Sequence, residues 1–510
     1  MRKIPWHQDA DVVIIGYGAA GAVAAITAHD GGSQTIIVEK QDGKTALTSS
    51  AMAAGVIICP NDLQGSRRYM EALYKVNDGL YWTEPDVIRA WAQYTSENKT
   101  WLESMGGVME LNRRGGAHNV PGFESIDIYR FRGMGFGLMR LLRSHVDKRN
   151  IPVVDNTAAT ALLLNTEGEI VGIAAQNRGS GDKVNIRARR GVVLATGGFE
   201  FNEQMKLQYL AVHPCYFTAS PANTGDGVVM AQEAGAQLWH MSCCAAGLRM
   251  KFPEVPSAMM PALGGKHWTS PGQSVLANFG GAGLLAQYAE RAAAVAGYIV
   301  VDRDGKRYTN ENFKVSSVYY ELQMYDSRRL FFPRVPSYWV FDQRRMNDGY
   351  LVGRSSGAAG PGRLYDWSPD NSKELDRGWI KSGNTIRELA GKLGIEADAL
   401  AATVRDYNRY CKNGIDMEFA REPATLIPLR EPPYYAVQLW PGGANTQGGP
   451  RRDSQARVLR ADGSPIPRLY GAGELGSIYG MLYPGSGGNL AECIAFGRIA
   501  GEEASHCRPS

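Results

Sequence analysis

Three glycines near the start of the chain have the spacing that a phosphate-binding turn requires. Gly16, Gly18 and Gly21 form a G-x-G-x-x-G pattern directly after an apolar run, and Glu39 follows Gly21 by 18 residues. In such a turn the first glycine allows a tight bend, the second lets the backbone approach a pyrophosphate, and the third packs a helix on a strand. An acidic residue about 20 positions later holds ribose hydroxyls. The pattern therefore predicts a dinucleotide site.

Two later segments share the glycine spacing but lack its surroundings. GAGELG (residues 471–476) repeats the spacing, and GAGLLA (residues 281–286) nearly does. Neither has strand, turn, helix, second strand and acidic residue in that order, which is the context that gives the pattern meaning. We expect GAGLLA to be a glycine-rich loop that leads into a helix, and a second nucleotide site there is the alternative.

The elements that must position the first site alternate between strands and helices. Residues 11–15 are expected to form a buried parallel strand, followed by an Ala-rich helix to about residue 29 and a second strand that ends at Glu39. This alternation is typical of an α/β fold with a parallel sheet. Further expected elements are a strand and hairpin over 151–177 with its turn at Glu167 and Gly168, a strand over 189–199, a helix opened by NTGDG (223–227), a strand over 468–476 and a helix over 485–504.

Composition excludes several classes of protein. The 510 residues carry a net charge of +4 without a long basic run, so no nucleic-acid partner is expected. No apolar stretch approaches the roughly 20 residues that a membrane-spanning helix needs, and the start of the chain does not resemble a signal peptide. Seven cysteines, an odd number without a C-x-x-C pair, favour a reducing, cytoplasmic location and indicate no metal site.

Five motifs taken together resemble one family. The glycine fingerprint with Glu39, VVLATGGF, NTGDG, YGAGE and GSGGNL…FGRIAG are similar in order to the fumarate reductase/succinate dehydrogenase flavoproteins, most of all to their 3-ketosteroid dehydrogenase branch, and run from about residue 11 to 504. The resemblance implies a Rossmann-like FAD-binding domain of the glutathione-reductase type with an inserted α+β catalytic or capping domain. The expected boundaries are 1–285 and 436–510 for the FAD domain and 286–435 for the insertion.

The resemblance also implies which segments contact FAD. Gly16, Gly18, Gly21 and Glu39 would hold the ADP half, Ser49, Ser50 and Gly55 would lie near the flavin ring, Gly197 and Gly198 would pass the diphosphate, Glu474 would hold the ribityl chain, and Asn489 and Leu490 would lie at a helix start beside the pyrimidine end. The remaining expected cofactor residues are Ala19, Ala20, Lys40, Ala158, Thr196, Asp226, Gly473 and Gly488. Succinate dehydrogenases attach FAD through a His in the loop after this Glu, and residues 40–58 contain no His, so we expect noncovalent FAD.

The dicarboxylate enzymes of this family bind carboxylates with two Arg and a His, and this chain departs at each matched position. Asn445 stands in place of the His, Val315 in place of one Arg, and residues 485–486 read Gly-Ser in place of the other. A pocket for two carboxylates needs fixed cations. These departures argue against fumarate or succinate and favour a neutral substrate that carries a carbonyl group.

Desaturation next to a ketone needs a base for the α-proton and hydrogen-bond donors for the carbonyl oxygen. By resemblance to the ketosteroid dehydrogenases, Tyr483 would act on the substrate, with Gly487 as a backbone donor to its oxygen. A tyrosine can be the base if its neighbours lower its pKa from about 10. The second family Tyr has no match at its usual place. Tyr319, Tyr320, Lys314 and another tyrosine of the pocket therefore stay open as the base. The alternative for Tyr483 is that it only packs on the edge of the flavin.

Three functions follow from this reading. The first is FAD-dependent α,β-dehydrogenation of a 3-ketosteroid or a smaller cyclic ketone, with α-proton abstraction by Tyr and hydride transfer to the flavin. The second runs the same chemistry backwards, as an ene-reductase. The third is an electron-transfer subunit of a complex. Because no NAD(P)H site is evident, we expect electrons to leave to a quinone-like or other diffusible acceptor; the sequence does not indicate an oligomeric state.

Overall fold

A computed structural model describes residues 4–263, 297–312 and 315–509 of the chain. They divide into two compact units. Unit 1 contains Met1–Leu210, Ala219–Ala245 and Asn445–Ser510, and unit 2 contains Ala211–Thr218 and Ala246–Ala444. None of the helices that the structure describes is long and apolar enough to span a bilayer.

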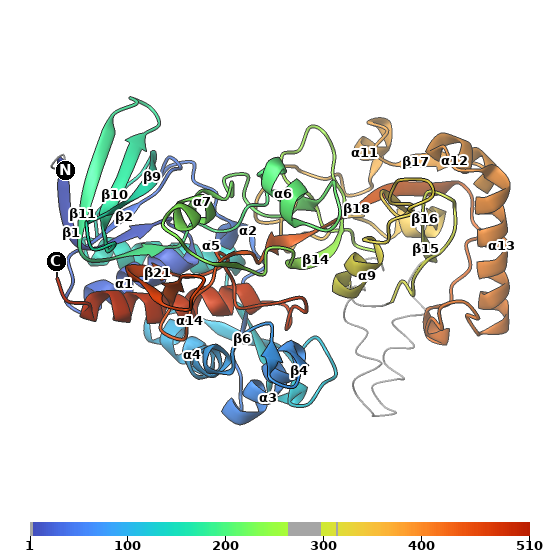
Figure 1. The fold of residues 1–510 in the computed structure, drawn as a ribbon. Helices are drawn as coiled ribbons and strands as arrows, with labels where there is room; N and C mark the ends of the chain where they lie inside the picture. Colours follow the sequence, from blue (N-terminus) through green and yellow to red (C-terminus); the bar gives the residue numbers. More distant parts are fainter. Residues whose placement is uncertain (1–3, 264–296, 313–314, 510) are drawn as a thin grey trace. The chain divides into compact units, whose positions relative to one another are not determined.

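A mainly parallel sheet forms the centre of unit 1 (Figure 1). Its parallel strands are β2 (Thr35–Val38), β1 (Gln8–Ile15), β11 (Lys183–Leu194) and β21 (Pro465–Gly471), with β8 (Val153–Val154) beside β2 and antiparallel β20 (Arg457–Leu459) beside β21. The last four residues of β1 pair in register with all of β2, from Val12 opposite Thr35 to Ile15 opposite Val38. The paired ends of these two strands, VVII in β1 and IIV in β2, are apolar and almost all buried, as is typical of a sheet covered on both faces. The expected hairpin is present as β9 (Thr157–Leu164) and β10 (Ile170–Asn177), with Gly168 at a φ of 77° in the turn.

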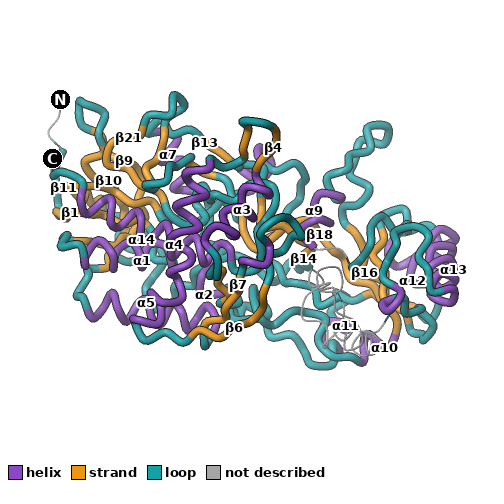
Figure 2. Tube along the Cα trace, turned by 90° about the horizontal axis from the view of Figure 1, so that it is seen from below, coloured by secondary structure: helices purple, strands orange, loops and turns teal. Residues whose placement is uncertain are grey.

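Two small-residue helices pack against each other on this sheet. α1 (Ala19–Asp30) and α14 (Gly488–His506) approach so closely that a Cβ on Gly497 would lie 2.9 Å from the carbonyl oxygen of Ala20. Figure 2 shows α4 (Pro85–Ser104) and α5 (Met134–Lys148) with them. The alanines and glycines of both helices are therefore a requirement of backbone contact.

The smaller elements of unit 1 lie around this core. A three-stranded antiparallel sheet has the order β3 (Val56–Ile58), β7 (Asp127–Phe131), β6 (Met109–Arg114). The other elements are α2 (Ser49–Met52), α3 (Leu63–Tyr74), α6 (Glu203–Tyr209), α7 (Asp226–Glu233), a 3-10 turn (Phe123–Ser125), and the strand pairs β4 (Lys75–Asn77) with β5 (Leu80–Tyr81) and β13 (Leu238–Trp239) with β19 (Gly449–Pro450).

Unit 2 is built on a second sheet in which β18 (Tyr434–Thr446) is the longest strand. β16 (Ser337–Asp342) lies between β18 and β15 (Tyr298–Val301), and β12 (Tyr216–Phe217), β14 (Cys244–Arg249) and β17 (Lys381–Gly383) also pair with β18. Apolar side chains of α12 (Ile386–Leu393) and α13 (Ala397–Asn413), such as Leu389 and Leu400, are buried against β15 and β16. The other elements are α9 (Val315–Glu321), α10 (Gln343–Asn347), α11 (Ser372–Asp376) and a 3-10 turn (Pro423–Thr425).

The two units divide the chain differently from the expected insertion at 286–435. Unit 2 takes in 211–218, begins again at residue 246 and continues to residue 444. The reason is the pairing of strands. β12 and β14 pair with β18, so the chain passes from unit 1 to unit 2 at these two strands. The expected boundary at 285 and the GAGLLA segment lie outside the described residues.

Candidate functional site

The turn between β1 and α1 contains two glycines, Gly16 and Gly21, at which a Cβ would collide with backbone atoms. Gly16 has a φ of +101°, and a Cβ there would collide with the carbonyl oxygen of Ala195. A Cβ on Gly21 would collide with the carbonyl of Gly16. Gly18 is the N-cap of α1, and a Cβ there would meet only Ser50 Oγ, at 3.5 Å. The turn therefore leaves room for a phosphate in front of a helix N-terminus.

The carboxylate of Glu39 lies at the end of β2, beside this turn. It is 6% exposed, and its oxygens accept the backbone N–H groups of Tyr17 at 2.7 Å and Gln41 at 2.8 Å. Each oxygen keeps a lone pair, so the carboxylate can also accept the hydroxyls of a ribose. Hydrogen bonds from two nearby backbone N–H groups thus fix the carboxylate of Glu39 in the orientation that a dinucleotide needs.

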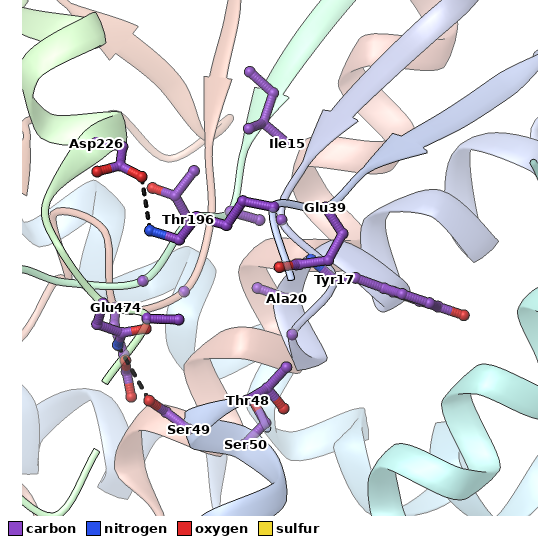
Figure 3. A pocket seen from close by; sticks show the side chains of 18 of the residues that line it. Ile15, Tyr17, Ala20, Glu39, Thr48, Ser49, Ser50, Thr196, Asp226 and Glu474 are labelled. Carbon is purple, nitrogen blue, oxygen red and sulfur yellow. Dashed lines mark hydrogen bonds and ion pairs between the residues drawn. The ribbon is translucent and has the colours of Figure 1, made fainter. Parts of the chain in front are cut away.

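The opposite wall comes from α2 and from the segment around α7 (Figure 3). Ser50 Oγ accepts the N–H of Ala19 at 3.1 Å, and Ser49 Oγ accepts the side-chain amide of Asn223 at 3.1 Å. Lys40 forms an ion pair with Asp226 at 2.7 Å. Residues 186 positions apart in the sequence are thereby joined at the edge of the site.

Glu474 lies in the GAGELG turn after β21. Burial, and secondarily the nearby carboxyls of Glu200 and Glu492, hold the pKa of Glu474 well above its usual range. Arg452 stabilises the turn: it forms a fully buried ion pair with Glu492 and donates to the carbonyl of Leu475 at 3.0 Å. The raised pKa favours the protonated carboxyl, which can both donate hydrogen bonds to ligand hydroxyls and accept them.

These segments enclose a pocket with about 750 Å³ of empty space, which is partly open to solvent. Of the residues expected to bind the cofactor, the following line it: Gly16, Gly18, Ala19, Ala20, Glu39, Lys40, Ser49, Ser50, Thr196, Gly197, Asp226, Gly473 and Glu474. Lining residues that the sequence did not single out include Tyr17, Gln41, Thr48, Asn223, Met230 and Cys493. Asn223 lies within the NTGDG motif, which was a signal for it; Met230 and Cys493 lie inside helices and had none.

Several expected cofactor residues do not line the pocket. In β9 the neighbours Thr157 and Ala159 line it and Ala158 does not, because alternate residues of a strand point to opposite faces. Gly55, with a φ of +66°, packs on the backbone of Met134. The others outside the lining are Gly21, Gly198, Gly488, Asn489 and Leu490.

The start of α14 holds Tyr483 in a fixed position. Its hydroxyl oxygen accepts the backbone N–H of Asn489 at 2.8 Å, and its ring packs edge-on against Tyr479. Asn489 and Gln447 exchange a reciprocal pair of amide hydrogen bonds at 3.0 and 3.2 Å. Gly487, with a φ of +90°, is the N-cap of α14. Burial raises the pKa of Tyr483, whereas a tyrosine base requires a lowered pKa, so Tyr483 is a neutral phenol.

The other candidate tyrosines belong to unit 2. Tyr319 and Tyr320 lie on α9 with their rings edge to face at 5.4 Å; Tyr319 is completely buried, with its hydroxyl 4.0 Å from Cys215 Sγ, and Tyr320 is half-buried. Lys314 lies outside the described residues. Asn445 is buried in unit 1, and its side-chain amide donates to the carbonyl of Thr446 at 2.8 Å.

One unpaired atom tests whether the pocket suits a dinucleotide. Thr196 lines the pocket, and its buried Oγ1 has no hydrogen-bond partner within the described part of the chain. A buried hydroxyl without a partner is costly. A phosphate oxygen between this hydroxyl and the Gly16 turn would remove that cost, and Glu39 would hold the ribose, so the residues present fit the ligand.

Comparison with known proteins agrees with this geometry. A profile of the FAD binding domain family matches residues 11–490. The 3-oxosteroid 1-dehydrogenase of Mycobacterium tuberculosis is 29% identical over 97% of this chain and 98% of its own length, and the urocanate reductase of Eggerthella lenta is 28% identical over 98% of this chain and 75% of its own. The crystal structure of 3-ketosteroid Δ1-dehydrogenase from Sterolibacterium denitrificans, in complex with 1,4-androstadiene-3,17-dione, superposes with a TM-score of 0.79 over 98% of this chain and 99% of that one. At 21% identity this last likeness concerns the fold.

The pocket and the family profile point to the same cofactor. The profile covers nearly the whole chain and includes the Gly16 turn, Glu39 and Glu474. The chain therefore belongs to the FAD binding domain family and is an FAD-dependent oxidoreductase.

Proposed function

We propose that this oxidoreductase introduces a double bond between the α and β carbons of a cyclic ketone. Bound FAD, held noncovalently, would accept the hydride from the β-carbon at its N5 atom. The observation that carries the proposal is the state of Tyr483. It is a neutral phenol, fixed at the N-terminus of a 19-residue helix, and its O–H has no acceptor among the described residues.

Tyr483 and Gly487 are assigned to the carbonyl oxygen of the substrate. The phenol oxygen already accepts the N–H of Asn489, so its own proton is available for a second partner. Because burial raises its pKa, this proton stays on the oxygen at neutral pH. The backbone N–H of Gly487 would be the second donor. Donors aimed at an oxygen that becomes negative are worth more in the transition state than with the ketone itself.

Removal of the α-proton is assigned to the tyrosine pair of unit 2. Tyr319 is completely buried, whereas Tyr320 keeps exposed surface on the same helix. A base must come within hydrogen-bond distance of the proton that it removes. We therefore favour Tyr320 as the base, with Tyr319 as its packing partner.

The reacting end of the substrate is proposed to be neutral. Asn445 presents an amide, and that amide is bonded to the neighbouring carbonyl of Thr446. The relative named 3-oxosteroid 1-dehydrogenase supports a 3-ketosteroid as the substrate. A smaller cyclic ketone is the alternative, and we propose a quinone-like or other diffusible acceptor for the electrons. The relative named urocanate reductase favours the second candidate, in which the same residues reduce an unsaturated carbonyl compound.

Anaerobic bleaching of the flavin tests the proposal. The FAD-loaded protein is mixed with a 3-ketosteroid, with cyclohexanone and with succinate, and the absorbance of the oxidised flavin is followed. We expect loss of absorbance with a ketone and none with succinate. Bleaching by succinate alone would overturn the assignment of Asn445. Reoxidation of the chemically reduced protein by an enone, without bleaching by any ketone, would select the reductase.

A further inference from the structure

Three consecutive carbonyl groups around Tyr483 each accept a hydrogen bond from a distant side chain of unit 1. Residues 482–484 belong to no helix or strand, so their carbonyl oxygens have no partners within such an element. The donors lie 365 to 415 positions earlier in the chain. The hydroxyl of Tyr74 donates to the carbonyl of Leu482 at 2.8 Å, His118 Nε2 to that of Tyr483 at 3.1 Å, and the hydroxyl of Tyr69 to that of Pro484 at 2.6 Å.

Two of the donors are completely buried tyrosines of α3. Burial raises the pKa of Tyr69 to about 12 and that of Tyr74 well above its usual range, so both hydroxyls keep the proton that they donate. The hydroxyl of Tyr69 also accepts the backbone N–H groups of Ala117 at 2.9 Å and of His118 at 3.2 Å. Tyr69 therefore fixes the backbone of the third donor as well as the carbonyl of Pro484.

The third donor, His118, bonds the very residue that carries the phenol. It is half-buried and lies in the loop that follows β6. A carbonyl oxygen can only accept a hydrogen bond, so Nε2 of His118 carries a proton. This holds for the imidazolium and for the neutral ring with its proton on Nε2. The bond to the carbonyl of Tyr483 therefore does not require a charged ring.

The position of this segment depends on the three bonds. Gly480 and Gly485 lie on either side of it, and glycine restricts the backbone least of all residues. The phenol is held at its other end, where its oxygen accepts the N–H of Asn489 at 2.8 Å. A shift of the Tyr483 backbone would therefore turn the O–H that is assigned to the ketone oxygen. Misplacement of a reacting group by about 1 Å can cost about a hundredfold in rate.

We propose that these three donors, Tyr69, Tyr74 and His118, are positioning residues of the reaction. They hold the backbone of Tyr483 so that its hydroxyl is aimed at the substrate carbonyl. The proposal rests on the proposed function, in which this hydroxyl donates to the ketone oxygen. If the three side chains only stabilised the fold, their loss would lower the melting temperature and leave the rate unchanged. If they position Tyr483, their loss lowers the rate, and does so only while the hydroxyl of Tyr483 is present.

Replacement of His118 tests the proposal in the FAD-loaded enzyme. The limiting rate of anaerobic flavin bleaching by a 3-ketosteroid is measured together with the half-saturating ketone concentration. We expect His118→Leu to lower the rate about ten- to a hundredfold and to change the half-saturating concentration less than threefold. His118→Gln, whose amide can donate to the same carbonyl, should keep the rate within threefold of wild type. His145→Leu is the matched control: it removes another half-buried histidine, which bonds the carbonyl of Met105 at 2.9 Å, and should keep the wild-type rate.

A double variant separates positioning from a general effect on the fold. In Tyr483→Phe, the further change His118→Leu should lower the rate less than twofold, because two residues that act through one hydroxyl are not additive. An equal factor in both backgrounds, a His118→Leu rate within threefold of wild type, or an equal loss in His145→Leu would overturn the proposal. If His118→Leu binds no FAD, Tyr74→Phe takes its place with the same expectations.

The same variants distinguish this proposal from the proposed function. A slow Tyr483→Phe enzyme together with a fast His118→Leu enzyme would refute the positioning role alone. A Tyr483→Phe enzyme with the wild-type rate would refute the role of the hydroxyl, and the positioning role with it. If no ketone bleaches the flavin, the rate compared among the variants is the reoxidation of the chemically reduced protein by an enone, with the same expected factors.

Discussion

Replacement of Tyr483 by phenylalanine removes one hydroxyl group, and it tests the proposed catalytic role of this group separately from its contribution to stability. The change removes a hydroxyl that accepts the backbone N–H of Asn489 at 2.8 Å and that is assigned as donor to the ketone oxygen. The ring, and its edge-on contact with Tyr479 at 5.6 Å, stay in place. The perturbation is therefore restricted to hydrogen bonds.

Two different costs follow from this loss. The N–H of Asn489 loses its acceptor in a buried place, which costs about 1–3 kcal/mol of stability. The substrate oxygen loses one of two assigned donors in the transition state, which corresponds to about a 10²- to 10³-fold lower kcat. Because Tyr483 does not line the candidate cofactor pocket, FAD should remain bound.

Tyr479→Phe is the matched control. The hydroxyl of Tyr479 donates to the carbonyl of Gly488 at 2.9 Å and accepts from Trp91 Nε1 at 2.8 Å, so its loss has a similar structural cost on the same helix start. Both variants are assayed for ketone-driven flavin bleaching, FAD content and melting temperature. We expect both to melt earlier and only Tyr483→Phe to lose its rate. A Tyr483→Phe enzyme with FAD bound and a kcat within threefold of wild type would refute the reasoning, as would an equal loss of rate in both.

Three further outcomes follow from the structure. Gly16→Ala should prevent folding or FAD binding altogether, because the φ of +101° and the carbonyl of Ala195 exclude a Cβ at this position. Gly18→Ala should fold, because its Cβ has room. This Cβ would occupy the phosphate site, so a titration should show FAD binding at least tenfold weaker. Burial raises the pKa of Glu200, so this group stabilises the apoprotein below about pH 4.5, and the stability is lost as pH rises through the raised pKa. In Glu200→Gln the free energy of unfolding should depend less on pH in this range. An unchanged slope of the free energy of unfolding against pH would contradict the prediction. Burial lowers the pKa of His240, so acidification from about pH 6.5 through the lowered pKa should destabilise the protein. Denaturant unfolding across this pH range should show a smaller pH dependence of stability for His240→Gln than for the wild type.

Local sequence determined the dinucleotide turn and the elements around it. β1, the Gly16 turn, α1 and β2 are adjacent in the chain, so hydrophobic pattern and glycine spacing were enough to predict them. The hairpin of β9 and β10 and the helix that starts after Gly487 were predictable for the same reason. Thirteen of the cofactor residues that the family resemblance implied line one pocket, although their motifs are spread from residue 16 to residue 474 of the chain.

Tertiary structure alone decided the features that depend on distant partners. Ala158 was expected at the cofactor, but strand register turns Thr157 and Ala159 toward it. The division between the units follows from the pairing of β12 and β14 with β18, some two hundred residues away in the chain, which no local pattern encodes. Burial, which is a property of the whole fold, raises the pKa of Tyr483 and keeps it a neutral phenol. The motifs of the sequence thus indicated the cofactor, whereas the protonation state of this tyrosine depends on side chains that only the fold brings around it.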